Sequence, residues 1–161
     1  MSTFTFYGFA DYEGGKIARL ETFGENIPVN IFVDNASDIT PSKGDVCSIE
    51  VCGEGSDLSF FATEEEYQVS GHRMATISLI PVGTFPLNPN DKQFHQSPHI
   101  LFSGIVRSVE WNPSAEDDEA NCCLTIETLD ITLTLYCRNE APVEAGYIVH
   151  GVAWLYGDMI V

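Results

Sequence analysis

Alternating apolar and polar residues along most of the chain predict β-strands. The clearest case is 131–137, where Ile131, Leu133 and Leu135 alternate with threonine and tyrosine side chains. Because successive side chains of a strand point to opposite faces, this segment has one buried face and one exposed face. Segments with the same pattern, or rich in β-branched and aromatic residues, are predicted as further strands: 3–12, 16–23, 29–33, 45–52, 58–62, 74–82, 100–111, 121–127 and 147–156.

Glycine-rich segments predict the turns between these strands. Glu13-Gly14-Gly15 predicts a tight hairpin turn, because glycine accepts the positive φ that such turns need. The segment 53–57 contains two glycines and predicts a turn between the strands on either side of it.

The helical signal is short. Thr63 precedes Glu64, Glu65 and Glu66, and a threonine N-cap followed by acids is typical of a helix N-terminus. The segment 67–71 is predicted to be extended, so the helix has one or two turns at most. The whole chain is therefore predicted as an all-β fold of antiparallel barrel or Greek-key units, with at most one short helix.

The last third of the chain has a recognisable order of elements. Gly104 predicts a bulge or bend in the strand 100–111, after which Ile105, Val109 and Trp111 share one face. An acidic hairpin tip, the alternating strand and a loop from Pro142 to Gly146 then lead into a closing strand.

This order, over about 60 residues (100–161), resembles the OB-fold, a small Greek-key barrel. The resemblance implies that the tip at 112–120 matches a ligand-binding loop. Another antiparallel barrel, or a sandwich, shares much of the same pattern.

Two segments follow the same order of strand, loop, proline, glycine and strand: 31–49 and 133–149. They indicate two related β-units, 1–82 and 100–161, which form either separate domains or one continuous domain. The alternative is that proline and glycine separate the strands of any all-β protein. A proline-rich connector, 83–99, lies between the units, and its Phe85, Leu87 and Phe94 predict that it packs on the surface.

Length and cysteine content indicate a globular cytoplasmic protein. At 161 residues the chain buries enough surface for a core without disulfides or metal. No apolar run approaches the roughly 20 residues of a membrane span, and no signal peptide is visible. The chain has an odd number of cysteines, five, and no CxxC motif. This favours free thiols in a reducing cytoplasm over a set of disulfides.

The charge is strongly negative. There are 24 acidic residues against seven lysines and arginines, for a net charge of −17. Such a field repels phosphate backbones and anionic membranes and attracts basic partners. Nucleic acid is therefore an unlikely partner and a basic protein a favoured one. General solubility is the alternative explanation, although the charge is about twice the upper end of what solubility needs in a small domain.

No residue pattern predicts catalysis, a cofactor or a metal. The chain has no GxGxxG, Walker loop, GxSxG or HExxH motif. His95 and His99 have the spacing of a zinc pair on a helix, but Pro98 between them disfavours that helix. The cysteines at 47, 52 and 137 lack basic neighbours that would activate a thiol.

The leading hypothesis is a non-catalytic acidic module that binds a basic protein surface, as an inhibitor, an immunity-type factor or a nucleic-acid mimic. A nucleic-acid-binding OB module and a structural subunit of a larger assembly are the alternatives. The predicted contact residues are the acids of the tip and of the helix start: Glu116, Asp117, Asp118, Glu119, Glu64, Glu65 and Glu66.

Overall fold

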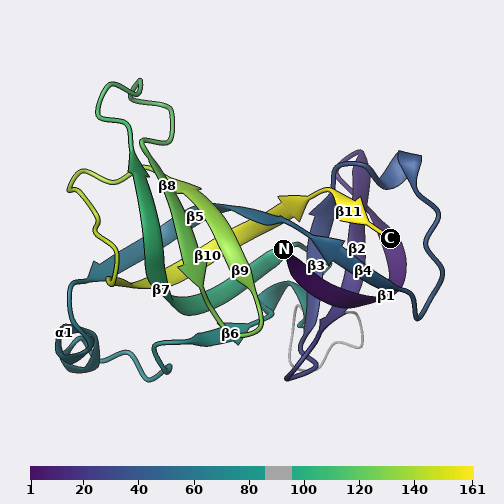
Figure 1. The fold of residues 1–161 in the computed structure, drawn as a ribbon, viewed down its shortest axis with the longest axis horizontal. Helices are drawn as coiled ribbons and strands as arrows, with labels where there is room; N and C mark the ends of the chain where they lie inside the picture. Colours follow the sequence, from purple (N-terminus) through teal and green to yellow (C-terminus); the bar gives the residue numbers. More distant parts are fainter. Residues whose placement is uncertain (86–95) are drawn as a thin grey trace.

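A computed structural model describes residues 1–85 and 96–161 and shows an all-β fold with one short α-helix (Figure 1). The prediction of the fold class is confirmed. The strands are β1 (Ser2–Tyr12), β2 (Gly15–Thr22), β3 (Pro28–Val33), β4 (Val46–Ile49), β5 (Val51–Phe61), β6 (Ser78–Ile80), β7 (His99–Trp111), β8 (Cys122–Glu127), β9 (Thr132–Cys137), β10 (Ile148–Gly157) and β11 (Met159–Ile160). The helices are α1 (Glu64–Val69) and the short 3₁₀ turns η1 (Ala36–Asp38) and η2 (Val82–Thr84). None of the helices in these described residues is long and apolar enough to cross a membrane.

Five strands close into a barrel, which we call the C-terminal barrel. The pairing order is β7-β8-β9-β5-β10, and β10 pairs with β7 to complete the circle. All of these pairs are antiparallel except β5 with β9, which is parallel. A closed five-stranded barrel is compatible with the OB-like fold that the sequence predicts.

The remaining strands form a second circuit of pairings, which we call the N-terminal ring. β1 pairs with β2 and β4, and β2 pairs with β3. The end of β10 pairs in parallel with β3, and β11, one residue further on, pairs with β4. In Figure 1, β5 and β10 run through the middle of the molecule from one circuit to the other.

The two circuits share one order of strands. In each, the third strand of the unit pairs in parallel with a strand that comes from the other half of the chain: β3 with β10, and β9 with β5. The similar segments 31–49 and 133–149 occupy matching places, from β3 to β4 and from β9 to β10. Both halves of the chain therefore contribute strands to the C-terminal barrel, and the number of domains stays a prediction.

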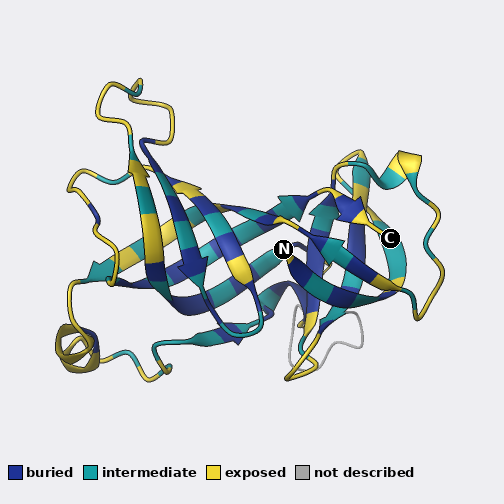
Figure 2. Cartoon of the chain, in the orientation of Figure 1, coloured by how far each residue is buried: buried dark blue, intermediate teal, exposed yellow. Residues whose placement is uncertain are grey.

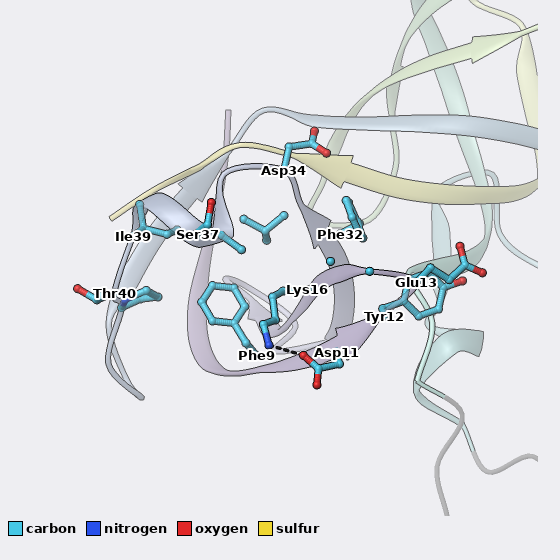
Figure 3. Close-up of a pocket in the computed structure, with 15 residues that line it drawn as sticks. Phe9, Asp11, Tyr12, Glu13, Lys16, Phe32, Asp34, Ser37, Ile39 and Thr40 are labelled. Carbon is cyan, nitrogen blue, oxygen red and sulfur yellow. Dashed lines mark hydrogen bonds and ion pairs between the residues drawn. The ribbon is translucent and has the colours of Figure 1, made fainter.

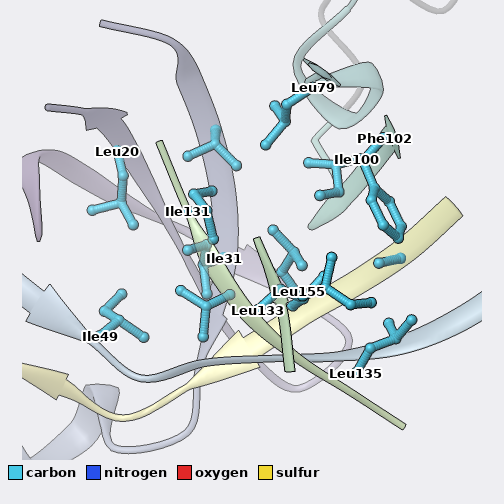
Figure 4. Packing of buried hydrophobic residues seen from close by; sticks show 14 of the residues in the cluster. Leu20, Ile31, Ile49, Leu79, Ile100, Phe102, Ile131, Leu133, Leu135 and Leu155 are labelled. Atoms are coloured by element: carbon cyan, nitrogen blue, oxygen red, sulfur yellow. The ribbon is translucent and has the colours of Figure 1, made fainter. Parts of the chain in front are cut away.

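A single cluster of buried apolar side chains fills both circuits (Figures 2 and 4). Leu20 and Ile31 enter it from the N-terminal ring, and Leu133, Leu135 and Leu155 from the barrel; all five are fully buried. Burying one such side chain contributes about 2 kcal/mol to the free energy of unfolding. Because the cluster has members in both circuits, it stabilises their packing against each other.

The predicted turn at 53–57 is wrong. β5 continues through it because β10 pairs along almost its whole length. The chain accommodates one extra residue there as a β-bulge: the register shifts between His150 and Val152, and Asp57 has a positive φ of 52°. Glycines at 53 and 55 thus belong to a strand and not to a turn.

The predicted bend at Gly104 is also misplaced. The register of β7 shifts between Val106 and Ser108, so the bulge lies three residues later. The face that Val109 and Trp111 share therefore excludes Ile105, which does not pack on the core cluster. Gly104 has a different role: a Cβ atom there would lie 2.7 Å from the carbonyl oxygen of Glu127.

The described ends of the connector are fixed by backbone contacts. Ser97 donates its N–H to the carbonyl oxygen of Gly83 at 3.1 Å. Asn30 Nδ2 donates to the carbonyl oxygen of Gly83 at 3.2 Å and to that of Ser97 at 3.3 Å. Phe85 is exposed, whereas Leu87 and Phe94 lie outside the described residues. Of the predicted strand 74–82, only β6 forms a ladder, with β7.

Candidate functional site

The acidic tip at 112–120 is an exposed loop held by one arginine. Arg138 Nη1 donates to the carbonyl oxygens of Glu116 and Glu119 at 2.7 and 2.9 Å, and Nη2 lies 3.6 Å from Asp117 Oδ1. The four acidic side chains of the tip are exposed. The predicted contact residues at 116–119 are thus accessible, and their loop has a fixed backbone.

The acids at the start of α1 have a local structural role. Thr63 accepts a hydrogen bond from Glu66 N at 3.1 Å, and Glu66 Oε2 accepts one from Ala62 N at 3.0 Å. The first bond satisfies an N–H group that the first turn of a helix leaves open, and the second joins Glu66 to the residue before the cap. Figure 1 shows α1 and the 112–120 loop at opposite ends of the C-terminal barrel, so the structure does not bring the two predicted clusters together.

A different set of acids meets aromatic side chains on the outside of the sheet. On β10, Trp154 and Tyr156 alternate with buried Ala153 and Leu155 and therefore point outward. Phe32 points outward from β3 in the same way. We call the outer surface of β3, β10, β5 and β9 that carries Phe32, Tyr156, Trp154, Glu54 and Tyr136 the acidic–aromatic face.

Strand register places a carboxylate of this face between two rings. Trp154 of β10 lies opposite Glu54 of β5, and Glu54 lies opposite Tyr136 of β9. The same line continues through Cys123 to Glu110. Residues directly opposite on neighbouring strands have Cβ atoms about 5 Å apart, so these side chains are immediate neighbours.

The rings of the face contact one another. Phe32 and Trp154 have centroids 5.3 Å apart, and Trp154 and Tyr156 have centroids 5.8 Å apart. Tyr12 extends the row, 6.5 Å from Phe32. Gly15 makes room for the Phe32 ring, because a Cβ atom at position 15 would lie 2.5 Å from that ring.

Negative groups surround Tyr156. Burial raises the pKa of Tyr156 to about 12, and Cys52, Tyr136, Glu54 and Asp34 add to the shift. Burial, and then the neighbouring Asp158 carboxylate, raise the pKa of Asp34. The phenol of Tyr156 is therefore neutral at physiological pH, and the carboxylates that act on it or on its neighbours are Glu54, Asp34 and Asp158.

Open hollows lie beside the rings of the face. One of about 460 Å³ lies beside Trp154 and is lined by Glu13 and Glu54. Another, of about 370 Å³, lies beside Tyr156 and is lined by Asp34, Glu50 and Asp158. A third, of about 300 Å³, lies between Trp111 and Tyr136 and includes Glu110. Each hollow combines an aromatic ring with at least one carboxylate.

A larger hollow of about 890 Å³ adjoins the face at Phe32 (Figure 3). It lies between the β1–β2 hairpin and the loop after β3, with Phe9 and Ile39 among its apolar walls. Lys16 is the positively charged residue among those that line the hollow, and it forms an ion pair with Asp11, which also lines it. The hollow thus offers apolar surface without a free cation.

A buried polar chain joins α1 to the barrel. Tyr67 donates its hydroxyl proton to the carbonyl of Met74 at 2.9 Å, so its oxygen accepts from Ser103 Oγ at 2.7 Å. The Ser103 proton is then committed, and the contact of 2.8 Å to His150 Nδ1 requires an Nδ1–H donor. Neutral His150 therefore leaves its Nε2 atom unprotonated.

His72 and His150 form a close pair, with ring centroids 4.1 Å apart. They are 78 residues apart in the sequence, and the fold brings the segment that follows α1 against the ring of His150 on β10. Burial, and then His72, lower the pKa of His150. His150 is hydrogen-bonded to Ser103 within the barrel. Ser103 beside it is fully buried, so no substrate reaches this serine in this conformation.

The five cysteines are free, and those with a shifted pKa are weakened as nucleophiles. Burial raises the pKa of Cys137 to about 12 and that of Cys47 to about 11. Burial is also the main cause that raises the pKa of Cys52 and Cys122. Within residues 1–85 and 96–161, no group of three or more potential ligands is placed to hold a metal ion, and His95 lies outside these residues.

Comparison of the chain with protein-family models, with curated protein sequences and with solved structures gave no match. The sequence pattern alone does not single out Trp154, Tyr136 or Glu54 as contact residues. The available signal was their place on the polar side of period-two strands, but only the register shows that they meet.

Proposed function

We propose that this protein is a non-catalytic, acidic protein-binding module that recognises a basic surface of a partner protein. Inhibitor, immunity-type factor and nucleic-acid mimic are the roles that such a surface serves. The observation that supports the proposal is the excess of exposed carboxylates over available cations. Lys16, Arg107 and Arg138 already face Asp11, Glu127 and Asp117, whereas other acids of the tip and the acids of the acidic–aromatic face form no ion pair with any cation of residues 1–85 and 96–161.

This charge distribution favours rapid encounter with a positive partner. A net charge of −17 on 161 residues creates a field that extends beyond contact and raises association rates at low salt. Binding of this kind weakens as ionic strength rises, since the Debye length falls to about 8 Å at 0.15 M salt.

We propose further that the C-terminal barrel is OB-like. Outward-facing aromatic rings on a barrel are also what a nucleic-acid-binding module uses for stacking. Here the rings of the face lie beside Glu54, Asp34 and Asp158, where a phosphate backbone needs cations. Recognition of a basic protein is therefore the stronger proposal, and the free thiols fit a reducing cytoplasm.

The test is affinity capture of a partner from the cells that make this protein, followed by elution in rising salt. We expect a basic protein to elute at or above 0.15 M NaCl. A variant with Glu116, Asp117, Asp118 and Glu119 changed to lysine should lose at least tenfold in affinity for that partner, because the tip then repels it.

A second variant with Glu64 and Glu65 changed to lysine tests the other predicted cluster and leaves the cap residue Glu66 intact. A gel-shift assay with single-stranded DNA and RNA serves as the control and should show no complex. Capture of nucleic acid by the wild-type protein, or of acidic partners alone, would contradict the proposed function.

A further inference from the structure

We propose that the acidic–aromatic face is an arginine-reading surface, on which Glu54, between Trp154 and Tyr136, takes a guanidinium group of an extended basic segment. This inference rests on the proposed function and adds to it the place and the chemistry of contact. It assigns the contact to the outer face of the sheet and not to either acidic cluster that the sequence singles out, although Asn112 and Ala120, the ends of the acidic tip, line the hollow at Tyr136.

The geometry at Glu54 fits a planar cation. Its carboxylate is exposed and lies directly between the two rings in the register of β10, β5 and β9. A guanidinium forms paired hydrogen bonds to a carboxylate, and its planar faces stack on aromatic rings. The three side chains supply all of these contacts to one arginine.

Glu54 is available for such a partner. Among the described residues it forms no ion pair and no hydrogen bond. Arg107 and Arg138 are engaged with Glu127 and with the acidic tip, so they do not neutralise it. An incoming cation therefore meets a carboxylate that has no competing partner within the described part of the chain.

The arrangement repeats along the face, which favours an extended segment with several basic side chains. Tyr156 lies beside Asp34, Glu50 and Asp158 in the hollow of about 370 Å³. Tyr136 borders another hollow, of about 300 Å³, with Glu110. A polypeptide in extended conformation places alternate side chains on one side about 7 Å apart, a spacing comparable to neighbouring sites on a sheet.

Charge complementarity selects the occupant. A second copy of this chain carries the same strong negative charge and is repelled. A neutral apolar segment would leave Glu54, Asp34 and Asp158 without counter-charges, which is costly once water is excluded. A segment rich in arginine satisfies the carboxylates and the rings together.

The experiment compares two peptides of equal charge, octa-arginine and octa-lysine, by calorimetric titration at 50 and 150 mM NaCl. Because the long-range field acts equally on both, a preference for arginine reports stacking and paired hydrogen bonds. We expect octa-arginine to bind at least about fivefold more tightly than octa-lysine and to keep that preference at the higher salt concentration.

Two matched pairs of variants locate the contact. Glu54→Gln and Glu116→Gln each remove one exposed carboxylate, but only the first lies on the face. Tyr136→Thr and Tyr7→Thr each remove a strand tyrosine of nearly equal exposure, 39% and 40%, and β1, which carries Tyr7, pairs with none of β10, β5 and β9. Melting temperatures confirm that each variant folds, and Glu54→Gln, an exposed polar change, remains informative if Tyr136→Thr does not fold.

We expect Glu54→Gln to weaken octa-arginine binding about tenfold and Tyr136→Thr about threefold, with both controls below twofold. Equal effects of Glu54→Gln and Glu116→Gln, or equal binding of the two peptides, would overturn the arginine-reading face and leave the proposed function standing. Failure of the wild-type protein to bind either peptide at 50 mM NaCl would count against both.

Discussion

At the scale of single residues, the paired histidines show how a polar group is held inside this fold. His150 donates from Nδ1 to Ser103, and Ser103 donates to Tyr67, which in turn donates to Met74. Protonation of Nε2 would place a positive charge in a partly buried site beside the ring of His72. The neutral form is therefore the one that the packing favours.

The lowered pKa of His150 predicts a loss of stability in mild acid. Its ordinary pKa is 6.5, so below that pH the unfolded chain binds a proton that the folded state resists. The free energy of unfolding should fall as pH drops from 7.5 to 5.5, by a fraction of the ~1.4 kcal/mol per pH unit that one full proton difference gives. Urea unfolding at several pH values measures this slope.

His150→Gln keeps a hydrogen-bonding side chain and should flatten that slope. An identical slope in wild type and His150→Gln would show that His150 does not control acid sensitivity.

At the scale of elements, β7 depends on two local features that serve different purposes. The bulge between Val106 and Ser108 turns Val109 and Trp111 toward the core. Gly104 lets the strand approach the backbone of Glu127 closely. The sequence predicts one irregularity in this strand, and the structure separates it into a bulge and a close contact.

Gly104→Ala should therefore be destabilising, by about 1–3 kcal/mol, because the added Cβ would lie 2.7 Å from a backbone oxygen. Gly8→Ala on β1 is the matched control, since a Cβ there has no neighbour within 4 Å. Thermal and urea unfolding of the two variants measure the difference. Equal stability of Gly104→Ala and wild type would show that β7 shifts to accommodate the methyl group.

Period-two patterning was sufficient to predict most strands, and the N-cap followed by acids was sufficient to predict the short helix, because each is specified by its own residues. It was insufficient for β5, where glycines at 53 and 55 indicated a turn. The reason is that β5 is held by β9 and β10, which follow it by many residues in sequence. A local pattern does not carry that information.

The same reasoning applies to the candidate site. The sequence singled out runs of acids at 64–66 and 116–119, which are adjacent along the chain. Glu54, Tyr136 and Trp154 are far apart in sequence and become neighbours only through strand register. Composition predicted that the net charge is negative. The fold determines which carboxylates lie beside aromatic rings.

At the scale of the whole molecule, neither half of the chain completes its own circuit. The C-terminal barrel needs β5, and the N-terminal ring needs the end of β10 together with β11. Further contacts cross between the halves: Thr22 Oγ1 donates to Asp130 at 2.8 Å, and Thr132 N donates to Ser2 Oγ at 3.1 Å.

Fragments 1–85 and 96–161 should therefore be unfolded when separate and should regain structure when mixed. β9 would lose its parallel partner β5, and β3 would lose its parallel partner β10, which leaves backbone groups and apolar side chains without partners in each fragment. Amide NMR spectra of the fragments and of their equimolar mixture provide the measurement, with the intact chain as reference. A dispersed spectrum from 96–161 alone would show that the barrel closes without β5.

The crossing of β10 into the N-terminal ring also has a consequence for biosynthesis. The first strands leave the ribosome early, but the segment that completes their circuit, Tyr156–Ile160, is translated more than 120 residues after β3. Until that segment emerges, the nascent chain exposes the edges of β3 and β4, to which chaperones and neighbouring nascent chains can bind. Slow, late completion of folding is therefore built into the order of the strands.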